Sequence, residues 1–413
     1  PLEDSGSTQV IYLRYASAEN LGPVLQGYVE QVAASEGGGQ NNQARTSASV
    51  VKVIPEPDTN ALVITAPPKI MRAVKDVVAQ LDIRRAQVLV EAIIAEGLEI
   101  EEGPALVVWA ARLPGVEVIP FRLVARPVGE GMGVLGWPDA ITDAPPGSVG
   151  PVLMLADPFS FPADGLLTEL HGEPAAPVVV GGMASGGQRP GEHCLFAGTD
   201  VLFEGAVAVG LRGSETVTVV SQACMPIGPE MVVTKAEGSS VLELAGMPAL
   251  QKLEEVVDAL DPAERALAVE GLMAGLVIDE NTPDYERGNF LVRPIHGGDR
   301  DSGALVLGEN PRIGQTMRFH VRDARSADED LRAALRDARG RMGAALPAGA
   351  LLFSCNGRGT RMFAEPNHDA NAVSQELSDL PLAGLFCNGE IGPVRGRSFL
   401  HGHTATMVVF TDA

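Results

Sequence analysis

The chain has 413 residues, 45% of them hydrophobic and 20% charged, which is typical of globular protein and not of a disordered chain. Its net charge of −22 disfavours nucleic acid and anionic membrane surfaces as partners. No apolar run approaches the roughly 20 residues of a membrane-spanning helix, so we expect no membrane insertion. The four cysteines form no CxxC pair and fit reduced thiols.

Residues 1–96 predict a small α+β module with the element order βαββαβ. Val10–Tyr15 alternates like a strand, and Ser17 is a cap for a helix over 18–34. A polar, glycine-rich loop is expected at 36–47. The remaining predicted elements are strands at 50–54 and 61–65, a helix at 68–81 that begins with proline, and a strand at 87–95.

Three stretches carry a resemblance: Tyr12-Leu-Arg-Tyr-Ala16, Thr59-Asn-Ala-Leu-Val-Ile-Thr-Ala66 and Gln80-Leu-Asp-Ile-Arg-Arg-Ala-Gln-Val-Leu-Val-Glu-Ala-Ile-Ile-Ala95. They are similar to the last periplasmic N-domain of secretins, the outer-membrane channels of type II secretion. The resemblance implies a domain that stacks into a ring, with the loop at 36–47 facing the lumen. The channel-forming domain of the family has no counterpart after Glu96, so we do not expect a channel.

This first module holds no His, no Cys and no clustered carboxylates, so a compact module without a site of its own is the favoured interpretation. Its last strand, at 87–95, has two candidate partners. We expect it to stay with its own small sheet, and the alternative is the edge of a sheet formed by the rest of the chain. If the strand stays with its own small sheet, the edge of the other sheet is left uncovered, and an uncovered edge favours aggregation.

The segment 97–413 predicts alternating strands and helices. Strands are expected at 106–111, 116–123 and 152–156, and a helix through Leu166 and Leu170 leads to a strand at 177–180. A strand–helix–strand unit pairs its strands in parallel, so part of this sheet is expected to be parallel. Gly181–Gly187 could hold an anion, but it lacks GxGxxG and a following Lys, and a plain tight connection is favoured.

After short β segments at 194–233, we expect a domain boundary near 235–240. The remaining predicted elements are helices at 248–260, 262–271 and 326–342, the last opened by a capping box at Ser326–Glu329, strands at 272–278, 289–294, 317–321 and 350–354, and four short strands up to Phe410. The fold class is therefore α+β (mixed α/β). Three domains are expected, at 1–96, 97–237 and 238–413.

Six stretches resemble motifs of the FIST family, in the family's order: Ala156-Asp-Pro-Phe-Ser-Phe161, Gly181-Gly-Met-Ala-Ser-Gly186, Ser221-Gln-Ala-Cys-Met-Pro-Ile-Gly228, Gly314-Gln-Thr-Met-Arg-Phe-His320, Phe353-Ser-Cys-Asn-Gly-Arg-Gly359 and Gly384-Leu-Phe-Cys-Asn-Gly-Glu-Ile-Gly-Pro393. The resemblance runs from about Gly97 to the end. It implies a sensory module with two α+β halves that binds small ligands, amino acids having been proposed.

Two features depart from the family pattern. Glu99–Ala105 resembles the middle of the FIST N-terminal half, so the secretin-like piece stands where that half should begin. The Gln-x-Cys motif carries Ala223 and Met225 where Gly and Arg are expected. This difference weakens any ligand role carried over to that loop.

Cys355 is the leading single candidate for a site, because it lies at a predicted strand end in Ser354-Cys-Asn-Gly-Arg-Gly359. Arg358 is placed to lower a thiol pKa and to pair with an anionic ligand. A ligand-facing thiol is favoured over a buried structural cysteine and over a nucleophile. A nucleophile needs a base, and none of the histidines at 320, 368, 401 and 403 lies at a diagnostic spacing.

The turn Asn388–Gly392 is expected to bring the Glu390 carboxylate to the same strand end. There it would face Arg358 and suit the two charged ends of an amino acid, and a plain turn with a solvated glutamate is the equal alternative. His401 and His403 share a strand face, but zinc needs further ligands. The resemblance places Arg361 and the segment Glu365-Pro-Asn-His-Asp369 in the same pocket. The expected ligand-binding residues are Cys355, Asn356, Arg358, Arg361, Asn388, Glu390 and His401.

The predicted function is a FIST-type sensor that captures a small polar ligand and shifts a domain or partner equilibrium. We expect no enzyme activity, no metal and no cofactor, and a signalling protein is the further candidate partner. One alternative is a type II secretion channel subunit, which rests on the first segment alone. Another is a thiol-dependent enzyme that uses Cys355. The expected compartment is the cytoplasm, or the periplasm if the secretin-like segment decides targeting.

Overall fold

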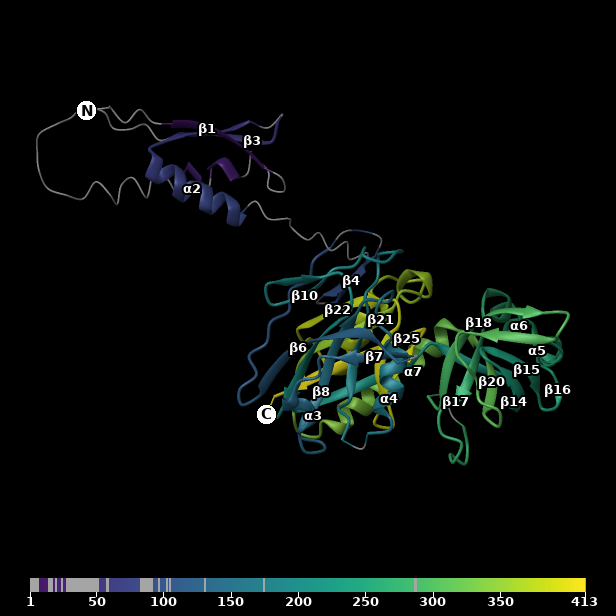
Figure 1. Ribbon diagram of the computed structural model, residues 1–413. Coiled ribbons are helices and arrows are strands. Elements are labelled where there is room, and N and C mark those ends of the chain that lie inside the picture. The colour runs from purple at the N-terminus through teal and green to yellow at the C-terminus, as the bar shows by residue number, and fades with distance from the viewer. Residues whose placement is uncertain are drawn as a thin grey trace, which may run out of the picture. The chain divides into compact units, whose positions relative to one another are not determined.

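Figure 1 shows the computed structural model of the chain, coloured from its N-terminus to its C-terminus. The structure describes residues 7–13, 18, 21–23, 25–26, 52–56, 59–81, 92–95, 97–101, 103, 105–129, 131–173, 175–285 and 288–412. The predicted loop at 36–47 and the parts of predicted elements at 14–17, 27–51 and 82–91 lie outside these residues. The chain divides into two units, Pro1–Gln87 and Val88–Ala413.

The first unit packs helices on one face of a three-stranded antiparallel sheet. Its strands, in spatial order, are β1 (Ser7–Tyr12), β3 (Ala61–Ala66) and β2 (Lys52–Glu56), and its helical residues are 18, 21–23, 25–26 and α2 (Pro68–Leu81). Leu62 and Ile64 alternate on β3 and are buried with Val74 of α2. The predicted order of strand, helix, strand, strand and helix is therefore confirmed where it is described.

The last predicted strand of the small module belongs to the second unit. β4 (Ala92–Ala95) pairs antiparallel with β22 (Leu382–Cys387), and Ile94 lies opposite Gly384. Ile94 is fully buried in the core that α7 (Ala324–Arg341) and α8 (His368–Leu377) cover. The expectation that this strand stays with its own sheet is therefore wrong for residues 92–95. Pairing along β22 satisfies backbone groups at that edge and takes the apolar Ile94 side chain out of water.

Two sheets packed face to face form the centre of the second unit (Figure 1). The first has the order β13 (Thr216–Gln222), β25 (Thr404–Thr411), β21 (Pro347–Cys355), β22, β4 and β5 (Leu98–Glu101). The second has the order β24 (Arg397–His401), β23 (Glu390–Val394), β9 (Val179–Met183), β8 (Val149–Ala156), β12 (Ala206–Arg212), β6 (Glu117–Val128) and β7 (Gly131–Leu135). Phe353 and Val408 meet Val180 between them.

Helices cover the outer faces of this sandwich. α7 and α8 pack on the first sheet, while α3 (Asp139–Thr142) and α4 (Ala163–Leu170) pack on the second. Central strands of the sandwich therefore place one set of alternating side chains between the sheets and the other set under helices.

A third sheet closes on itself, because β14, the first strand of its order, also pairs with β15, the last but one. Its order is β14 (Cys224–Glu237), β20 (Thr316–Arg322), β17 (Leu272–Val277), β18 (Phe290–Asp299), β19 (Ala304–Leu307), β15 (Ser240–Leu244) and β16 (Met247–Pro248). Val256 of α5 (Ala249–Ala259) and Ala268 of α6 (Pro262–Glu270) belong to its core. The remaining elements are the hairpin of β10 (Leu195–Ala197) and β11 (Asp200–Leu202) and the 3₁₀ turn η1 (Gly359–Arg361).

Strands that are distant in sequence share the two sandwich sheets. β13 pairs with the last strand, β25, and β23 pairs with β9. Two pairs are parallel, namely β8 with β9, as predicted, and β21 with β22. These two pairs position the candidate site.

Two local predictions differ from the structure. Residues 106–111 form no strand. Trp109 packs on Phe410 at 5.1 Å between ring centres, but no strand pairs with this stretch, and Leu106 and Val108 are exposed. α7 begins at Ala324, and not after Ser326, because the Asp323 side chain caps it by accepting from the Ser326 N–H at 2.8 Å. Of the helices described here, none has the length and apolarity to cross a bilayer.

The placement of β4 predicts that Ile94→Ala destabilises the second unit by about 2–5 kcal/mol, the usual cost of a buried Ile truncation. Both tryptophans, Trp109 and Trp137, lie in that unit, so tryptophan fluorescence during urea unfolding of the full chain measures it. Leu98→Ala, at an exposed position of β5, should stay within about 0.5 kcal/mol of the wild type. Equal effects of the two variants would contradict the pairing.

Candidate functional site

The carboxyl ends of the two parallel strand pairs meet at one place. β8 and β9 end beside Met183, and β21 and β22 end at Cys355 and Cys387. The Asn388 N–H donates to the Met183 carbonyl at 3.1 Å, and the Met183 N–H donates to the Gly389 carbonyl at 2.8 Å. In α/β sheets, ligands bind outside the carboxyl ends of parallel strands. We refer to this meeting point as the strand tips.

Two glycines allow close packing near the strand tips. A Cβ atom at Gly182 would lie 2.3 Å from the sulfur of Cys387 in the other sheet, and one at Gly181 would lie 1.8 Å from the carbonyl oxygen of Met154 on the neighbouring strand β8. The Ser185 hydroxyl then donates to the Phe386 carbonyl. Gly182 therefore serves close packing between the sheets, and Gly181 serves the close approach of β8 and β9.

Arg358 and Asp369 form a fully buried ion pair behind the end of β21. Arg358 donates from Nε and Nη2 to the carboxylate at 2.8 and 2.7 Å, and the Ser354 hydroxyl donates to it at 2.7 Å. Burial alone would raise the pKa of Asp369, but Arg358 and the His368 ring lower it well below its ordinary value. Nη1 of Arg358 has no hydrogen-bond partner among the described residues.

Glu390 is also fully buried, and only one of its oxygens is satisfied. Oε2 accepts from the Thr404 hydroxyl at 2.7 Å and from the Thr404 N–H at 3.2 Å, while Oε1 has no partner within the described structure. Burial raises the pKa of Glu390 to about 8, because the Thr404 bonds and the Arg358 charge offset only part of it. The sequence suggested a charged Glu390 facing Arg358. The structure instead pairs Arg358 with Asp369 and favours a neutral Glu390 near pH 7.

The two cysteines at the strand tips are poor nucleophiles. Burial, and then the nearby Glu390, raises the pKa of Cys355 to about 12, and the Gly357 N–H and Arg358 compensate only in part. Burial also raises the pKa of Cys387 well above its ordinary value. Since the thiolate is the reactive form, this environment argues against the thiol enzyme.

Around this buried cluster lies a more accessible rim. Asn388 and Arg361 are exposed, and Asn356 and His403 are half-buried. The Asn356 N–H donates to the Cys387 carbonyl at 3.0 Å, and Arg361 Nη1 donates to the Asn356 carbonyl at 3.4 Å. The rim therefore brings two residues with side-chain amides and one with a guanidinium next to the ends of β21 and β22.

His401 lies opposite Glu390 in the β23–β24 pair. It is buried, and its Nε2 lies 3.0 Å from the Gly392 carbonyl oxygen. Burial lowers the pKa of both His401 and His403 to about 4, so both rings are neutral near pH 7. In the part of the chain that the structure describes, no three His, Cys, Asp or Glu residues are grouped as a metal ion would need.

Comparison with known proteins shows which families this chain resembles. The FIST N domain model matches residues 58–247, and the FIST C domain model matches 249–393. An uncharacterised protein of Mycobacterium bovis is 43% identical over 324 residues, which cover 78% of this chain and 82% of that protein. One of Mycobacterium tuberculosis is 42% identical over 322 residues, with the same coverage. The chain belongs to the FIST family. FIST domains imply a sensory or signal-transduction role.

A second family covers the front of this FIST chain. The model of the bacterial type II/III secretion system short domain matches residues 8–87. Secretin GspD of Vibrio cholerae is 42% identical over 127 residues, which are 31% of this chain and 18% of the secretin. The chain therefore spans less than a fifth of that secretin. Both resemblances seen in the sequence are confirmed, and the two family matches overlap at 58–87, within the first unit.

The structure brings four of the six FIST motifs together at the strand tips. They are the stretches 156–161, 181–186, 353–359 and 384–393, which follow or contain the ends of β8, β9, β21 and β22. Of the expected site residues, Cys355, Arg358 and Glu390 lie in the buried cluster. Asn356, Arg361 and Asn388 lie on the rim, and His401 lies beside Glu390 on β24.

Sequence analysis predicted only part of what completes this cluster. Asp369, which pairs with Arg358, belongs to the stretch 365–369 that the resemblance placed in the pocket. Thr404, which holds Glu390, was not predicted. Glu101 of β5 accepts from the Thr360 N–H at 2.9 Å, just after the tip of β21. Glu99 accepts from the Ala370 N–H at 2.9 Å, and burial, with a contribution from Asp369, raises its pKa to about 7. For Glu99 and Glu101 the available signal was the pair of acidic residues on alternate positions of β5.

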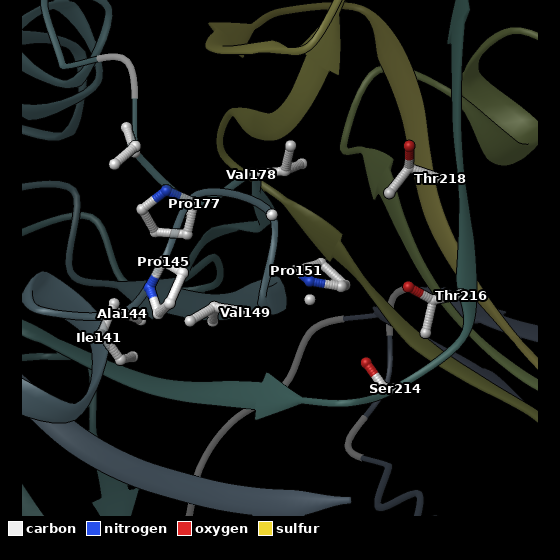
Figure 2. A pocket seen from close by; sticks show the side chains of 14 residues that line it. Ile141, Ala144, Pro145, Val149, Pro151, Pro177, Val178, Ser214, Thr216 and Thr218 are labelled. Carbon is white, nitrogen blue, oxygen red and sulfur yellow. The ribbon is translucent and has the colours of Figure 1, made fainter.

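A cavity of about 310 Å³ lies away from the strand tips (Figure 2). It is lined near the amino ends of β8 and β9, by residues such as Val149, Pro151 and Val178, and it includes none of the expected site residues. It also holds none of the buried, unpartnered polar atoms found at the strand tips. The strand tips are therefore the better candidate for the polar site.

The state of Glu390 predicts a pH dependence that Glu390→Gln removes. Its pKa is raised from 4.5 to about 8, so the folded state binds more protons than the unfolded state between these values, and stability falls as pH rises. From pH 6.5 to 8 the wild type should lose about 1–2 kcal/mol more than Glu390→Gln. His401 and His403 oppose this trend only below about pH 6.5, where unfolded histidines are protonated.

Urea unfolding of the full chain at several pH values, followed by tryptophan fluorescence, measures this difference. Glu99→Gln is the matched control, because the lower pKa of Glu99, about 7, confines its effect to the lower part of the range. Parallel pH profiles for wild type and Glu390→Gln would contradict a neutral Glu390.

Proposed function

We propose that this FIST chain is a sensor that binds a small polar ligand, an amino acid or a close analogue, at the strand tips. One observation carries the proposal: two fully buried side chains, Arg358 and Glu390, each keep one polar atom without a partner in the described structure. Buried polar atoms in proteins are nearly always hydrogen-bonded. Both residues lie close in sequence to the more accessible Asn356, Arg361 and Asn388.

In this proposal the ligand's carboxylate accepts hydrogen bonds from Asn356, Asn388 and Arg361. Its amino group meets Oε1 of Glu390. Because Glu390 is fully buried, the turn at Asn388–Gly389 has to move for the ligand to reach it. That turn leads into β23, which pairs with β9 and β24 in the second sheet. A ligand that binds the conformation with the moved turn more tightly therefore increases the fraction of molecules whose sandwich has that conformation. The signal would pass to a protein partner, and the compartment we propose is the cytoplasm.

A thermal-shift screen of the full chain with free amino acids tests this function. At least one amino acid should raise the Tm of the wild type, and Asn388→Ala and Arg361→Ala should weaken that ligand by about tenfold each, which corresponds to 1.4 kcal/mol. Both positions are exposed, so the fold should change by less than about 0.5 kcal/mol.

Arg325→Ala is the matched control, because Arg325 is an exposed arginine on α7. It should respond like the wild type. If no amino acid shifts the Tm, the ligand class is wrong. If ligands act equally on wild type and on both rim variants, the strand tips are not the site.

The first unit supports a second candidate function, as an assembly module. The match to the secretion short domain covers nearly all of this unit, and the resemblance implies ring stacking. Val10, Val63 and Ile54 form one row across its sheet, and Val10 and Ile54 are exposed. In that case the compartment would be the periplasm.

Sedimentation of the full chain at increasing concentrations measures such assembly. An assembly module predicts concentration-dependent oligomers that Val10→Asp disrupts. Val269→Asp, at an exposed position on α6, should leave them intact. A monomer at every concentration would exclude this candidate.

A further inference from the structure

Two neighbouring cavities run along one side of the sandwich, at the amino ends of β8 and β9. The first has a volume of about 310 Å³ and the second of about 540 Å³. Val178 and Thr218 line both, so the two volumes adjoin. Small-molecule sites usually occupy cavities of roughly 300–1,000 Å³.

The first cavity has an apolar wall and a hydroxyl wall (Figure 2). Ile141, prolines, alanines and valines form the apolar wall. Ser214, Thr216 and Thr218, on and just before β13, form the other. None of the described residues that line it is ionisable. An apolar group fits here without leaving a charge desolvated.

Charged side chains line the second cavity. Its lining includes Arg341, Arg395, Asp330 and Gln222. The aspartate already accepts from the Gln222 N–H at 2.8 Å. Arg395 donates to the Thr282 hydroxyl and the Asn289 side chain at 2.7 and 2.8 Å, and it pairs with Asp279 at 3.5 Å. Two cations and one engaged anion therefore line this part of the space, and Arg395 already has a carboxylate partner outside the lining.

Arg341 connects the two cavities. It donates from Nη2 to the Thr218 carbonyl at 2.7 Å and from Nε to Asp337 at 2.9 Å. Arg341 lines the second cavity, and its hydrogen-bond partner Thr218 is one of the two residues that line both volumes. Its side chain is 48% exposed, which leaves room for a further anionic partner.

We propose that these joined cavities bind an amphipathic organic carboxylate, with its apolar part along the proline wall and its carboxylate at Arg341. Guanidinium groups are suited to carboxylates. The net charge of −22 acts weakly here, since salt screens charges more than about 8 Å apart at physiological ionic strength. This site needs no assumption about the strand tips, and none of the expected site residues lines it.

Other occupants fit the space less well. An extended peptide would add to the free edge of β13, but Asp330 already binds the Gln222 N–H and Arg341 binds the Thr218 carbonyl at that edge. A cationic amine would face two guanidinium groups. An alcohol of the same length would lack the charge that Arg341 attracts.

Isothermal titration of the full chain with hexanoate, hexanol and hexylamine tests the proposal. Hexanoate should bind at least tenfold more tightly than the other two. Arg341→Gln should weaken hexanoate by about tenfold or more, and Ala176→Phe, which fills the first cavity, should weaken it as well. Arg325→Gln is the matched control, because Arg325 also lies on α7 and pairs with a carboxylate four residues on.

Equal binding of hexanoate and hexanol would overturn the proposal, as would hexanoate binding that neither Arg341→Gln nor Ala176→Phe changes. If circular dichroism shows that Arg341→Gln is not folded, the effect of Ala176→Phe on hexanoate binding decides whether the proposal holds. Asn388→Ala should leave hexanoate binding unchanged, and its loss there would assign the ligand to the strand tips instead.

Discussion

The buried pair of Arg358 and Asp369 is the interaction on which the strand tips depend. It connects the loop after β21 to the first turn of α8. Removing one partner of such a pair costs about 3–5 kcal/mol, because the other charge stays buried and alone. The pair also determines the chemistry next to it. With the charge of Arg358 engaged by Asp369, Glu390 lacks a counter-charge of its own and holds its proton to about pH 8.

The junction between the two family segments is part of this architecture. Residues 92–95 supply a strand of the FIST sheet, and β5 places Glu101 and Glu99 against the loop after β21 and the start of α8. These residues follow the match to the secretion short domain, which ends at 87, and they lie within the FIST N match. Similarity between the two family sequences matters less for this pairing than two physical requirements. An open sheet edge has to be paired, and its apolar face has to be covered.

The two proposed sites lie at opposite ends of the same parallel strands, β8 and β9. At the carboxyl ends, buried polar groups keep atoms without hydrogen-bond partners in the described structure, which suits a small and fully hydrogen-bonded ligand. At the amino ends, an open volume has one apolar and one cationic part, which suits an amphipathic anion. Each arrangement is set by local groups, although the protein as a whole is strongly acidic.

Local sequence patterns predicted most elements and one feature of topology. The strand–helix–strand pattern at 152–180 predicted the parallel pair of β8 and β9, and the Cys355 strand end and the Asn388 turn were correctly expected to be neighbours. The prediction failed at 106–111, where an apolar run is present but no strand pairs with it. Element patterns depend on neighbours in sequence, so a single chain reveals them.

By itself, then, the sequence determined which segments become strands and helices, the family, and the approximate place of the candidate site. Only the tertiary structure decided that Arg358 pairs with Asp369, that Glu390 is neutral, and that residues 92–95 join the second unit. The physical reason is that burial and pairing are set by segments far apart in the chain. The dehydration of a carboxyl group depends on which residues pack around it, and a local sequence pattern does not predict those residues.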